Sequence, residues 1–351
     1  MLILGRDAAF RGIPACDLPN DVLIMQRALS YKPESADSTR IDIADCGTAM
    51  RFLTAYFAVV PSDILLTGTE RMKQRPIAPL VDALRQLGAD IRYSEKDGFP
   101  PLIIKGSYLK GGVVHVRGDV SSQFISALML VSHLTECGIT VNILPPVVSS
   151  PYIQLTQAVI DNPCFPLEAD WSSAAFWYEY VAINGKKSVH LLDLNPESLQ
   201  PDSVAVQLFE QLGVESELTE GGIMLRPAGN VCKSLEWNFT DCPDLYPAVA
   251  ATCHALNVDT RFTGLQTLKL KESDRIETMR QGLQLLSTLN TQLSNFSQPS
   301  TLNSDHRIVM ALAVINAAKG FPLPPFLLHS DAVAKSYPHF REDMDLISES
   351  R

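Results

Sequence analysis

Five stretches of the chain share one arrangement of polar and hydrophobic positions. Each begins with small, polar or cap-forming residues and continues as an apolar run of about three helical turns. The runs are apolar on most faces, which indicates helices buried inside a domain. They start about 50 to 75 residues apart, a spacing typical of internal repeats. The five stretches are CGTAMRFLTAYFAV from Cys46, SSQFISALMLVSHL from Ser121, SSAAFWYEYVAI from Ser172, PDLYPAVAATCHAL from Pro243 and SDHRIVMALAVINA from Ser304.

Strands and amphipathic helices are predicted between these buried helices. The strand-like runs are rich in β-branched residues and end in glycine or turn residues, whereas the helical runs repeat their apolar positions with a period near 3.6. This alternation predicts an α/β protein of two domains, 1–169 and 170–351. The predicted strands are 63–68, 101–106, 112–118, 139–144, 187–194, 222–229 and 259–265, and the predicted amphipathic helices are 76–91, 152–160, 203–216 and 274–286.

Composition excludes several classes of protein. The net charge is −10 and the sequence has no basic stripe, so a nucleic-acid partner is not expected. No run approaches the roughly 20 apolar residues of a membrane span. The seven cysteines form no CxxC pair, which argues against a disulfide framework or a zinc site and favours reduced thiols in the cytoplasm.

The fifth stretch places Asp305, His306 and Arg307 directly before the apolar run 308–314. A helix N-terminus exposes unpaired N–H groups and the positive end of a dipole, which makes it an anion site. Several buried helices that directed their N-termini at one cleft would therefore attract anions despite the negative net charge. The simpler interpretation of each stretch is that its first residues only cap the helix.

Three further segments concentrate basic residues. Each has a simpler alternative interpretation. The segment around Lys271 could be a solvated helix start with ion pairs, the segment around Arg71 a surface loop, and Lys335 a surface lysine. The segments are LKLKESDRIETMR with Lys271, Glu272 and Arg275, GTERMKQRP with Arg71, Lys73 and Arg75, and AVAKSYPHF with Lys335.

Taken together, these segments resemble the 5-enolpyruvylshikimate-3-phosphate synthase family. The stretches CGTAMR, RMKQRPI, VSSQF, SSPYI, DWSSA, CPDL, KLKESDR, SDHR and AKSYP occur in the family's order. The resemblance implies the two-domain enolpyruvyl transferase fold, an inside-out α/β barrel whose domains are built from repeated units with buried parallel helices. It also implies an active site in the cleft between the domains, a cytoplasmic monomer and no cofactor.

The resemblance implies transfer of the enolpyruvyl group of phosphoenolpyruvate to the 5-hydroxyl of shikimate 3-phosphate, with release of phosphate. It assigns catalysis to Asp244 as the base for the hydroxyl and to Glu272, helped by Lys271, at the methylene carbon. It further implies inhibition by glyphosate, since Gly47 leaves room beside phosphoenolpyruvate. Phosphoenolpyruvate binding is assigned to Gly47, Arg75, Gln123, Arg275, Arg307 and Lys335, and shikimate 3-phosphate binding to Ser121, Ser122, Gln123, Ser149, Tyr152, Asp244, Thr267 and Lys271.

Two alternative functions remain: a UDP-N-acetylglucosamine enolpyruvyl transferase, and a catalytically impaired homologue that only binds ligands. The first usually has a cysteine in the loop where this chain has GTERMKQRP. The second is favoured by departures from the family pattern. The chain begins after the family's GSKSxSNR-like segment, so its N-terminal repeat is expected to be incomplete, and it is short near 160–163 and 294–299. Asp45, Phe52 and Thr267 also replace the family's usual residues.

Overall fold

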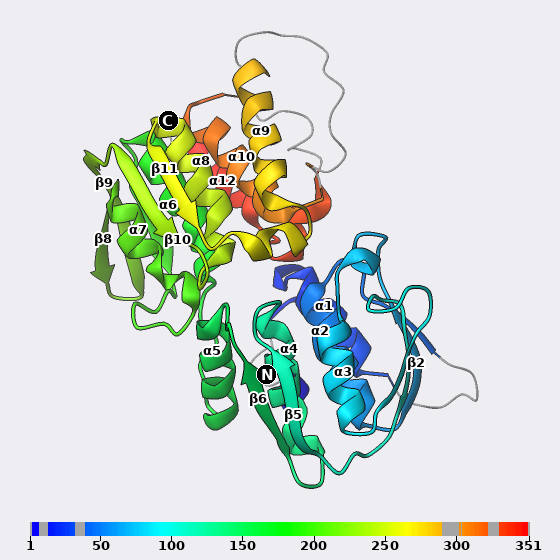
Figure 1. Ribbon diagram of the computed structural model, residues 1–351. Helices are drawn as coiled ribbons and strands as arrows, with labels where there is room; N and C mark the ends of the chain where they lie inside the picture. The colour runs from blue at the N-terminus through cyan, green and yellow to red at the C-terminus, as the bar shows by residue number, and fades with distance from the viewer. Residues whose placement is uncertain are drawn as a thin grey trace. The chain divides into compact units, whose positions relative to one another are not determined.

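The computed structural model describes residues 2–6, 13–31, 39–289, 302, 304–321 and 330–349. The chain divides into two compact units, Met1–Pro166 and Leu167–Arg351. The division predicted after residue 169 and this one both fall in the irregular segment between helix α5, Ser150–Asp161, and helix α6, Trp171–Asn184 (Figure 1). The predicted shortening near 294–299 lies outside the described residues.

The first unit contains two copies of a strand–helix–strand–helix arrangement. In each copy, two parallel strands are joined by a buried helix: β1 and β2 by α2, and β5 and β6 by α4. The first copy continues into an antiparallel hairpin, giving the strand order β1-β2-β4-β3. The elements are α1 Asn20–Leu29, β1 Thr39–Asp42, α2 Gly47–Val59, β2 Ser62–Thr67, α3 Ala78–Gln86, β3 Asp90–Tyr93, β4 Leu102–Gly106, β5 Gly112–Arg117, α4 Ser122–Val131, β6 Ile139–Leu144 and α5 Ser150–Asp161.

The second unit repeats the theme. Parallel strands β10 and β11 are joined by the buried helix α8, and β7, β9 and β8 form an antiparallel sheet in that order. The elements are α6 Trp171–Asn184, β7 Val189–Leu192, α7 Ala205–Glu210, β8 Leu212–Thr219, β9 Gly222–Val231, β10 Ser234–Asn238, α8 Tyr246–Leu256, β11 Asp259–Thr263, α9 Arg275–Leu289, α10 His306–Ala318 and α12 Phe340–Glu349.

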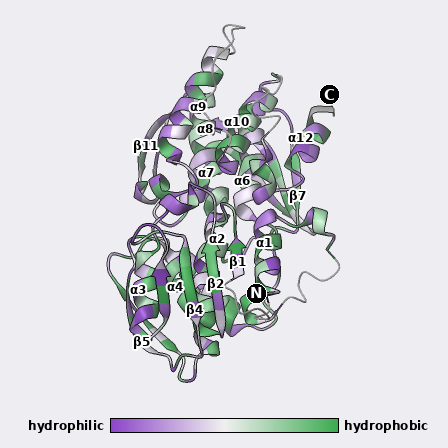
Figure 2. Ribbon diagram, turned by 90° about the vertical axis from the view of Figure 1, so that its right-hand side faces the viewer, coloured by the Kyte–Doolittle hydropathy of each residue, from purple (hydrophilic) through white to green (hydrophobic). Residues whose placement is uncertain are grey.

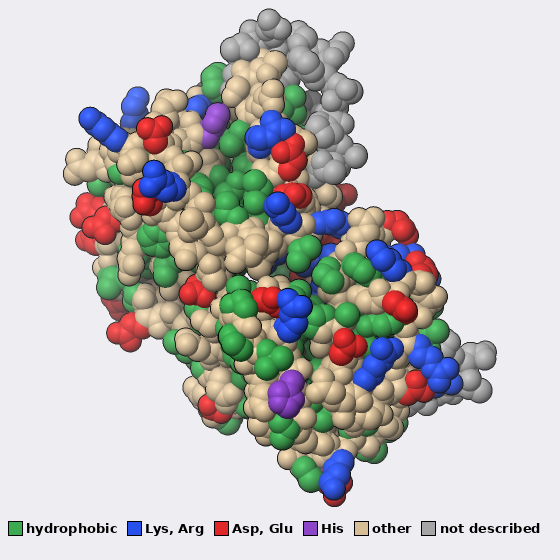
Figure 3. All heavy atoms as spheres, in the orientation of Figure 1, with side chains coloured by type: hydrophobic (Ala, Val, Ile, Leu, Met, Phe, Trp, Pro, Cys, Tyr) green, Lys and Arg blue, Asp and Glu red, His purple; other side chains and the backbone are tan. Residues whose placement is uncertain are grey.

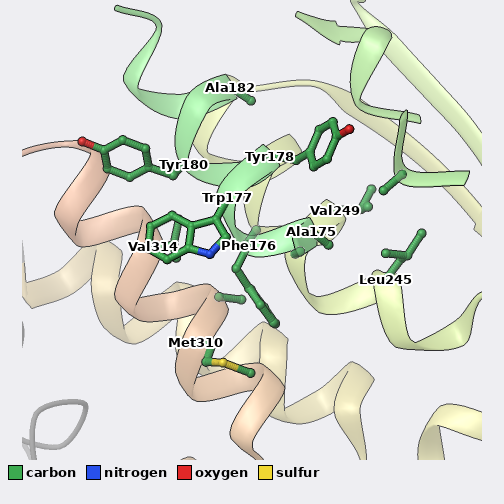
Figure 4. Packing of buried hydrophobic residues seen from close by; sticks show 14 of the residues in the cluster. Ala175, Phe176, Trp177, Tyr178, Tyr180, Ala182, Leu245, Val249, Met310 and Val314 are labelled. Atoms are coloured by element: carbon green, nitrogen blue, oxygen red, sulfur yellow. The ribbon is translucent and has the colours of Figure 1, made fainter. Parts of the chain in front are cut away.

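The five helices predicted to be buried are confirmed as α2, α4, α6, α8 and α10. Most of their residues are buried, since these sequences carry apolar residues on every face. In the second unit α6, α8 and α10 pack against one another. Figure 4 shows Phe176 and Trp177 of α6 directed toward α10, where Met310 and Val314 lie. In the first unit the hydrophobic strands β2 and β4 cover the buried helix α2 (Figure 2).

Two predicted helices are too long. The helix predicted over 203–216 ends at Glu210, and strand β8 begins at Leu212. The helix predicted over 76–91 ends at Gln86, and strand β3 begins at Asp90. Gly88 explains the second error, because its φ of 94° is a left-handed conformation that terminates a helix.

Candidate active site

An aspartate stands at the N-terminal end of each of the three buried helices of the second unit. Asp170 caps α6 and accepts from the backbone N–H groups of Ser172 and Ser173. Asp305 caps α10 and accepts from the N–H of Arg307 at 3.1 Å. Asp244 lies in the 3₁₀ turn Pro243–Leu245, directly before α8. The helix dipoles favour negative charge at all three positions.

Arg275 connects two of these aspartates to Glu272. Its guanidinium donates to Asp244 Oδ1 at 2.7 Å, to Glu272 Oε2 at 3.0 Å and to Asp305 Oδ2 at 2.9 Å. The residue is 1% exposed. Burial alone would lower the pKa of Arg275, but Asp305, Glu272 and Asp244 together raise it. Arg275 is therefore a permanent cation at the centre of a buried charge network.

Asp244 is held by three cations. Besides Arg275, Lys271 Nζ donates to Oδ1 at 3.2 Å and Arg307 Nη2 donates to Oδ2 at 3.2 Å. Burial raises the pKa of Asp244, but Arg307, Lys271 and Arg275 outweigh it and bring the pKa well below the usual value. Asp244 is consequently a carboxylate throughout the physiological pH range.

Glu272 forms the other branch of the network. Its Oε1 accepts from Lys335 Nζ at 3.1 Å, while its Oε2 accepts from Arg275. Lys335 ends the 3₁₀ turn Asp331–Lys335 and is 6% exposed, so the simple alternative of a surface lysine is wrong. Glu272 is thus placed between two buried cations.

His306 lies next to this network as a neutral ring. It is 4% exposed, and its Nδ1 lies 4.0 Å from Asp305 Oδ1, beyond hydrogen-bond reach. Burial, followed by Arg307, lowers the pKa of His306 to about 3. The ring therefore adds no positive charge at neutral pH.

The network differs from the ion pairs on the surface. Arg226 with Glu217 and Arg261 with Glu236 pair across neighbouring strands with exposed side chains, and Figure 3 shows such blue and red side chains side by side. Exposed pairs of this kind contribute about 0–1 kcal/mol. A buried network instead concentrates charge where water does not screen it.

The site residues predicted in the first unit gather around the starts of α2 and α4. Arg75 lies against Gly47, where an added Cβ would be 2.7 Å from Arg75 Nη1. Gln123 Nε2 donates to Thr48 Oγ1 at 3.2 Å and so joins α4 to α2. Arg51 donates to the carbonyl oxygen of Gly47 at 3.3 Å. The buried guanidinium of Arg75 therefore lies beside the backbone of Gly47, which has no side chain.

The remaining predicted residues occupy helix starts or a turn. Ser121 is the N-cap of α4, and its hydroxyl accepts from the N–H of Gln123 at 3.3 Å. Ser149 precedes α5 with a left-handed φ of 56°, and Tyr152 lies in the first turn of that helix. Thr267 lies in the 3₁₀ turn Gln266–Leu270, and Lys271 follows that turn.

Sequence reasoning did not identify the role of Asp305 or of Asp202. The sequence marks Asp305 only as part of the polar start of α10, yet it accepts from Arg275 and from the hydroxyl of Ser273 at 3.0 Å. Asp202 directly precedes the amphipathic segment 203–216, and no signal in the sequence separates it from an ordinary helix-start acid. Within the described ranges, no group of three or more His, Cys, Asp or Glu side chains could hold a metal ion.

In the part of the chain that the structure describes, no helix has the length and hydropathy needed to cross a bilayer.

Comparison with known proteins identifies one family. The family model for EPSP synthase (3-phosphoshikimate 1-carboxyvinyltransferase) matches residues 17–163 and 161–344. The 3-phosphoshikimate 1-carboxyvinyltransferase of Bacteroides fragilis strain YCH46 is 38% identical, over 96% of this chain and 88% of the relative. The enzyme of the same name from Methanospirillum hungatei JF-1 is 31% identical, over 87% of this chain and 78% of the relative.

Solved structures show the same fold. A 2.37 Å structure of EPSP synthase from Acinetobacter baumannii superposes with a TM-score of 0.63 at 19% sequence identity, covering 94% of this chain and 88% of that chain. A second structure of EPSP synthase from that organism gives a TM-score of 0.62. The predicted fold class is confirmed.

Proposed function

The chain belongs to the EPSP synthase family, and from this premise we propose that it transfers the enolpyruvyl group of phosphoenolpyruvate to the 5-hydroxyl of shikimate 3-phosphate. The observation that carries the proposal is the buried network of Asp244, Glu272, Lys271, Arg275 and Arg307. It combines an ionised base with cations suited to phosphate and carboxylate groups.

In the proposed reaction, the 5-hydroxyl oxygen attacks C2 of phosphoenolpyruvate while its proton passes to Asp244. The methylene carbon gains a proton, which gives a tetrahedral adduct that is not bonded to the protein. The adduct then loses a methyl proton, its C2–O bond to the phosphate breaks, and inorganic phosphate leaves. Glu272 lies between Arg275 and Lys335, and we assign it, with Lys271, to the proton at the methylene carbon.

The cations around Asp244 suggest how its basicity changes during the reaction. With three cations bound to it, Asp244 has a low pKa and is a weak base. Anionic substrates compete with Asp244 for Arg275 and Arg307. As these guanidinium groups turn to phosphate and carboxylate oxygens, the pKa of Asp244 rises toward the value that burial alone would give. Substrate binding thereby activates the base.

We assign the remaining binding roles as the family pattern implies. Gly47, Arg75 and Gln123 bind phosphoenolpyruvate together with Arg275, Arg307 and Lys335. Ser121, Ser122, Ser149, Tyr152 and Thr267 bind shikimate 3-phosphate with Lys271. The placement of Ser121 and Ser149 at the starts of α4 and α5 supports this assignment, because such positions favour phosphate.

We further propose a cytoplasmic monomer. The seven cysteines, all of which lie in the described ranges, form no disulfide with one another, which suits a reducing compartment. The network from Asp244 to Lys335 is built from one chain, so it needs no second subunit. Sedimentation at micromolar concentrations would give a dimer mass if the monomer assignment is wrong.

The function is tested by measuring phosphate release with both substrates. We expect turnover that requires phosphoenolpyruvate and shikimate 3-phosphate together, with a kcat of about 1–1,000 s⁻¹ as is usual for enzymes. UDP-N-acetylglucosamine in place of shikimate 3-phosphate should give none, and its turnover would favour the other transferase. Calorimetric binding of shikimate 3-phosphate without any phosphate release would instead favour the impaired homologue.

Replacing Gly47 by Ala is expected to weaken phosphoenolpyruvate binding. The new Cβ would approach Arg75 Nη1 to 2.7 Å, so the flexible end of that side chain must move while the backbone stays in place. We expect KM for phosphoenolpyruvate to rise about tenfold, equivalent to ~1.4 kcal/mol, with little change in the thermal midpoint. KM for shikimate 3-phosphate serves as the internal control. An unchanged KM for phosphoenolpyruvate would argue against a role for Gly47 and Arg75.

A further inference from the structure

Asp202 is a buried carboxyl group that packs beside the start of α6 and that the proposed mechanism does not use. It lies in the 3₁₀ turn Pro201–Val204 and is 2% exposed. The preceding Gln200 fixes this turn, because its Oε1 accepts from the N–H of Trp171 at 2.9 Å and its Nε2 donates to the carbonyl of Ala169 at 2.8 Å. The Asp202 side chain is therefore held in one place against the helix.

Among the residues that the structure describes, the carboxyl group of Asp202 has one hydrogen-bond partner, and that partner is neutral. The hydroxyl of Ser172 donates to its Oδ2. Its Oδ1 is buried and has no hydrogen-bond partner among the described residues. An ionised carboxylate in such a place lacks the cations that a buried charge requires. A neutral carboxylic acid fits it better.

Charged groups from three elements act on Asp202. Asp170 at the N-cap of α6 and Asp244 before α8 disfavour its ionisation, whereas Arg307 on α10 favours it. Burial is the largest influence, and the combined effect raises the pKa of Asp202 to about 7. Burial, helped by the negative charges of Asp202 and Asp244, raises the pKa of the nearby Cys242 thiol to about 12, so this thiol remains neutral.

The two acids whose charges act on Arg307, Asp244 and Asp202, thus have opposite character. Asp244 is ionised and accepts from Arg307, Lys271 and Arg275, whereas Asp202 has the hydroxyl of Ser172. If Asp202 ionised, a second negative charge would compete for Arg307. It would also repel the anionic groups that Arg307 is proposed to bind.

We propose that Asp202 is a positioning residue that acts through Arg307 and Asp244, and that the site accepts its anionic substrate only while Asp202 is a neutral acid. This inference rests on the proposed function, because it takes phosphoenolpyruvate as the anion that meets Arg307. Asp202 itself touches no reacting atom in this scheme. Its protonation state sets how much positive charge Arg307 offers.

The first test is the pH dependence of kcat/KM for phosphoenolpyruvate in Asp202→Asn. Asparagine has the shape of the neutral acid and does not titrate. Between about pH 6 and pH 9, we expect kcat/KM of the parent to fall at least tenfold more than that of the variant, as one ionisation with a pKa near 7 requires. Other groups that titrate in this range are common to both proteins and cancel in the comparison.

Ser172→Ala gives a second variant that keeps the acid. Its hydroxyl favours the ionised form of Asp202, so its loss should raise the pKa of Asp202 and move the fall in kcat/KM to higher pH. Ser173→Ala is the matched control, because that hydroxyl donates to Asp170 at 2.6 Å, and it should leave the fall where it is. The proposal would be overturned if Asp202→Asn lowered kcat/KM by the same factor at every pH. It would also be overturned if the fall in kcat/KM of Ser172→Ala occurred at the same pH as in the parent.

Thermal unfolding tests the titration without turnover. A folded-state pKa raised above the unfolded value means that Asp202 destabilises the fold as the pH rises from about 4 to about 7. The midpoint of Asp202→Asn minus that of the parent should therefore increase between about pH 5 and pH 8. If this difference in midpoint is the same at every pH, the inference is overturned, even where the parent shows no activity. If the difference increases with pH but the parent has no activity, only the proposed function is overturned.

Discussion

Replacing Asp244 by Asn is expected to lower kcat by about 10²–10⁴-fold, the usual loss when a positioned general base is removed. Asparagine keeps the shape of the side chain but cannot take the proton of the 5-hydroxyl. The exposed Asp241, three residues earlier, provides a control, and Asp241→Asn should behave like the parent. Steady-state phosphate release measures both variants.

Binding should respond differently from turnover. In Asp244→Asn, Lys271, Arg275 and Arg307 no longer have the negatively charged carboxylate to which all three donate. Anionic substrates then have less competition for these cations, so the affinity for shikimate 3-phosphate should stay within about tenfold of the parent. Near-parental kcat in Asp244→Asn would remove Asp244 from the mechanism. A large loss of affinity with kcat preserved would make it a binding residue instead.

The buried helices could be predicted because their signal lies within one segment. Runs such as 308–314 are apolar on every face, which is typical of a helix buried inside a domain. Strand β8 was missed for the opposite reason. The pattern of polar and apolar residues continues unchanged from the short helix α7 into Leu212–Thr219. These residues form a strand because they pair with β9, which is a tertiary contact.

The site shows the same limit. Lys271, Glu272 and Arg275 are close in sequence, so their cluster was visible. Lys335 is 63 positions from Glu272, and nothing in its neighbourhood indicates the ion pair that the fold creates. Asp202 is the clearest failure, because its burial and its neighbours depend on α6, α8 and α10 meeting at one end.

Replacing Arg275 by Met is expected to destabilise the second unit by about 3–5 kcal/mol, because it leaves buried carboxylates without their cation. Methionine fills a similar volume, so the loss reflects charge rather than a cavity. Arg275→Lys should lie between the parent and Arg275→Met, since a single ammonium cannot donate to three separated acids. Arg280 on the same helix pairs with Glu277 in an exposed position, and Arg280→Met is the matched control with little expected change in the denaturation midpoint.

The dependence of this loss on pH separates charge from packing. In the parent, burial raises the pKa values of Asp305 and Asp244, but the neighbouring cations, Arg275 among them, outweigh burial and lower both values. Folded-state pKa values below the unfolded ones stabilise the protein above the unfolded pKa near 4, and this stability is lost as the pH falls through the folded values. Without Arg275, these acids protonate more readily. The difference in unfolding free energy between parent and Arg275→Met should therefore be largest near neutral pH and shrink below about pH 4. Denaturant titrations at several pH values measure it, and a difference that stays constant with pH would show that Arg275 contributes by packing alone.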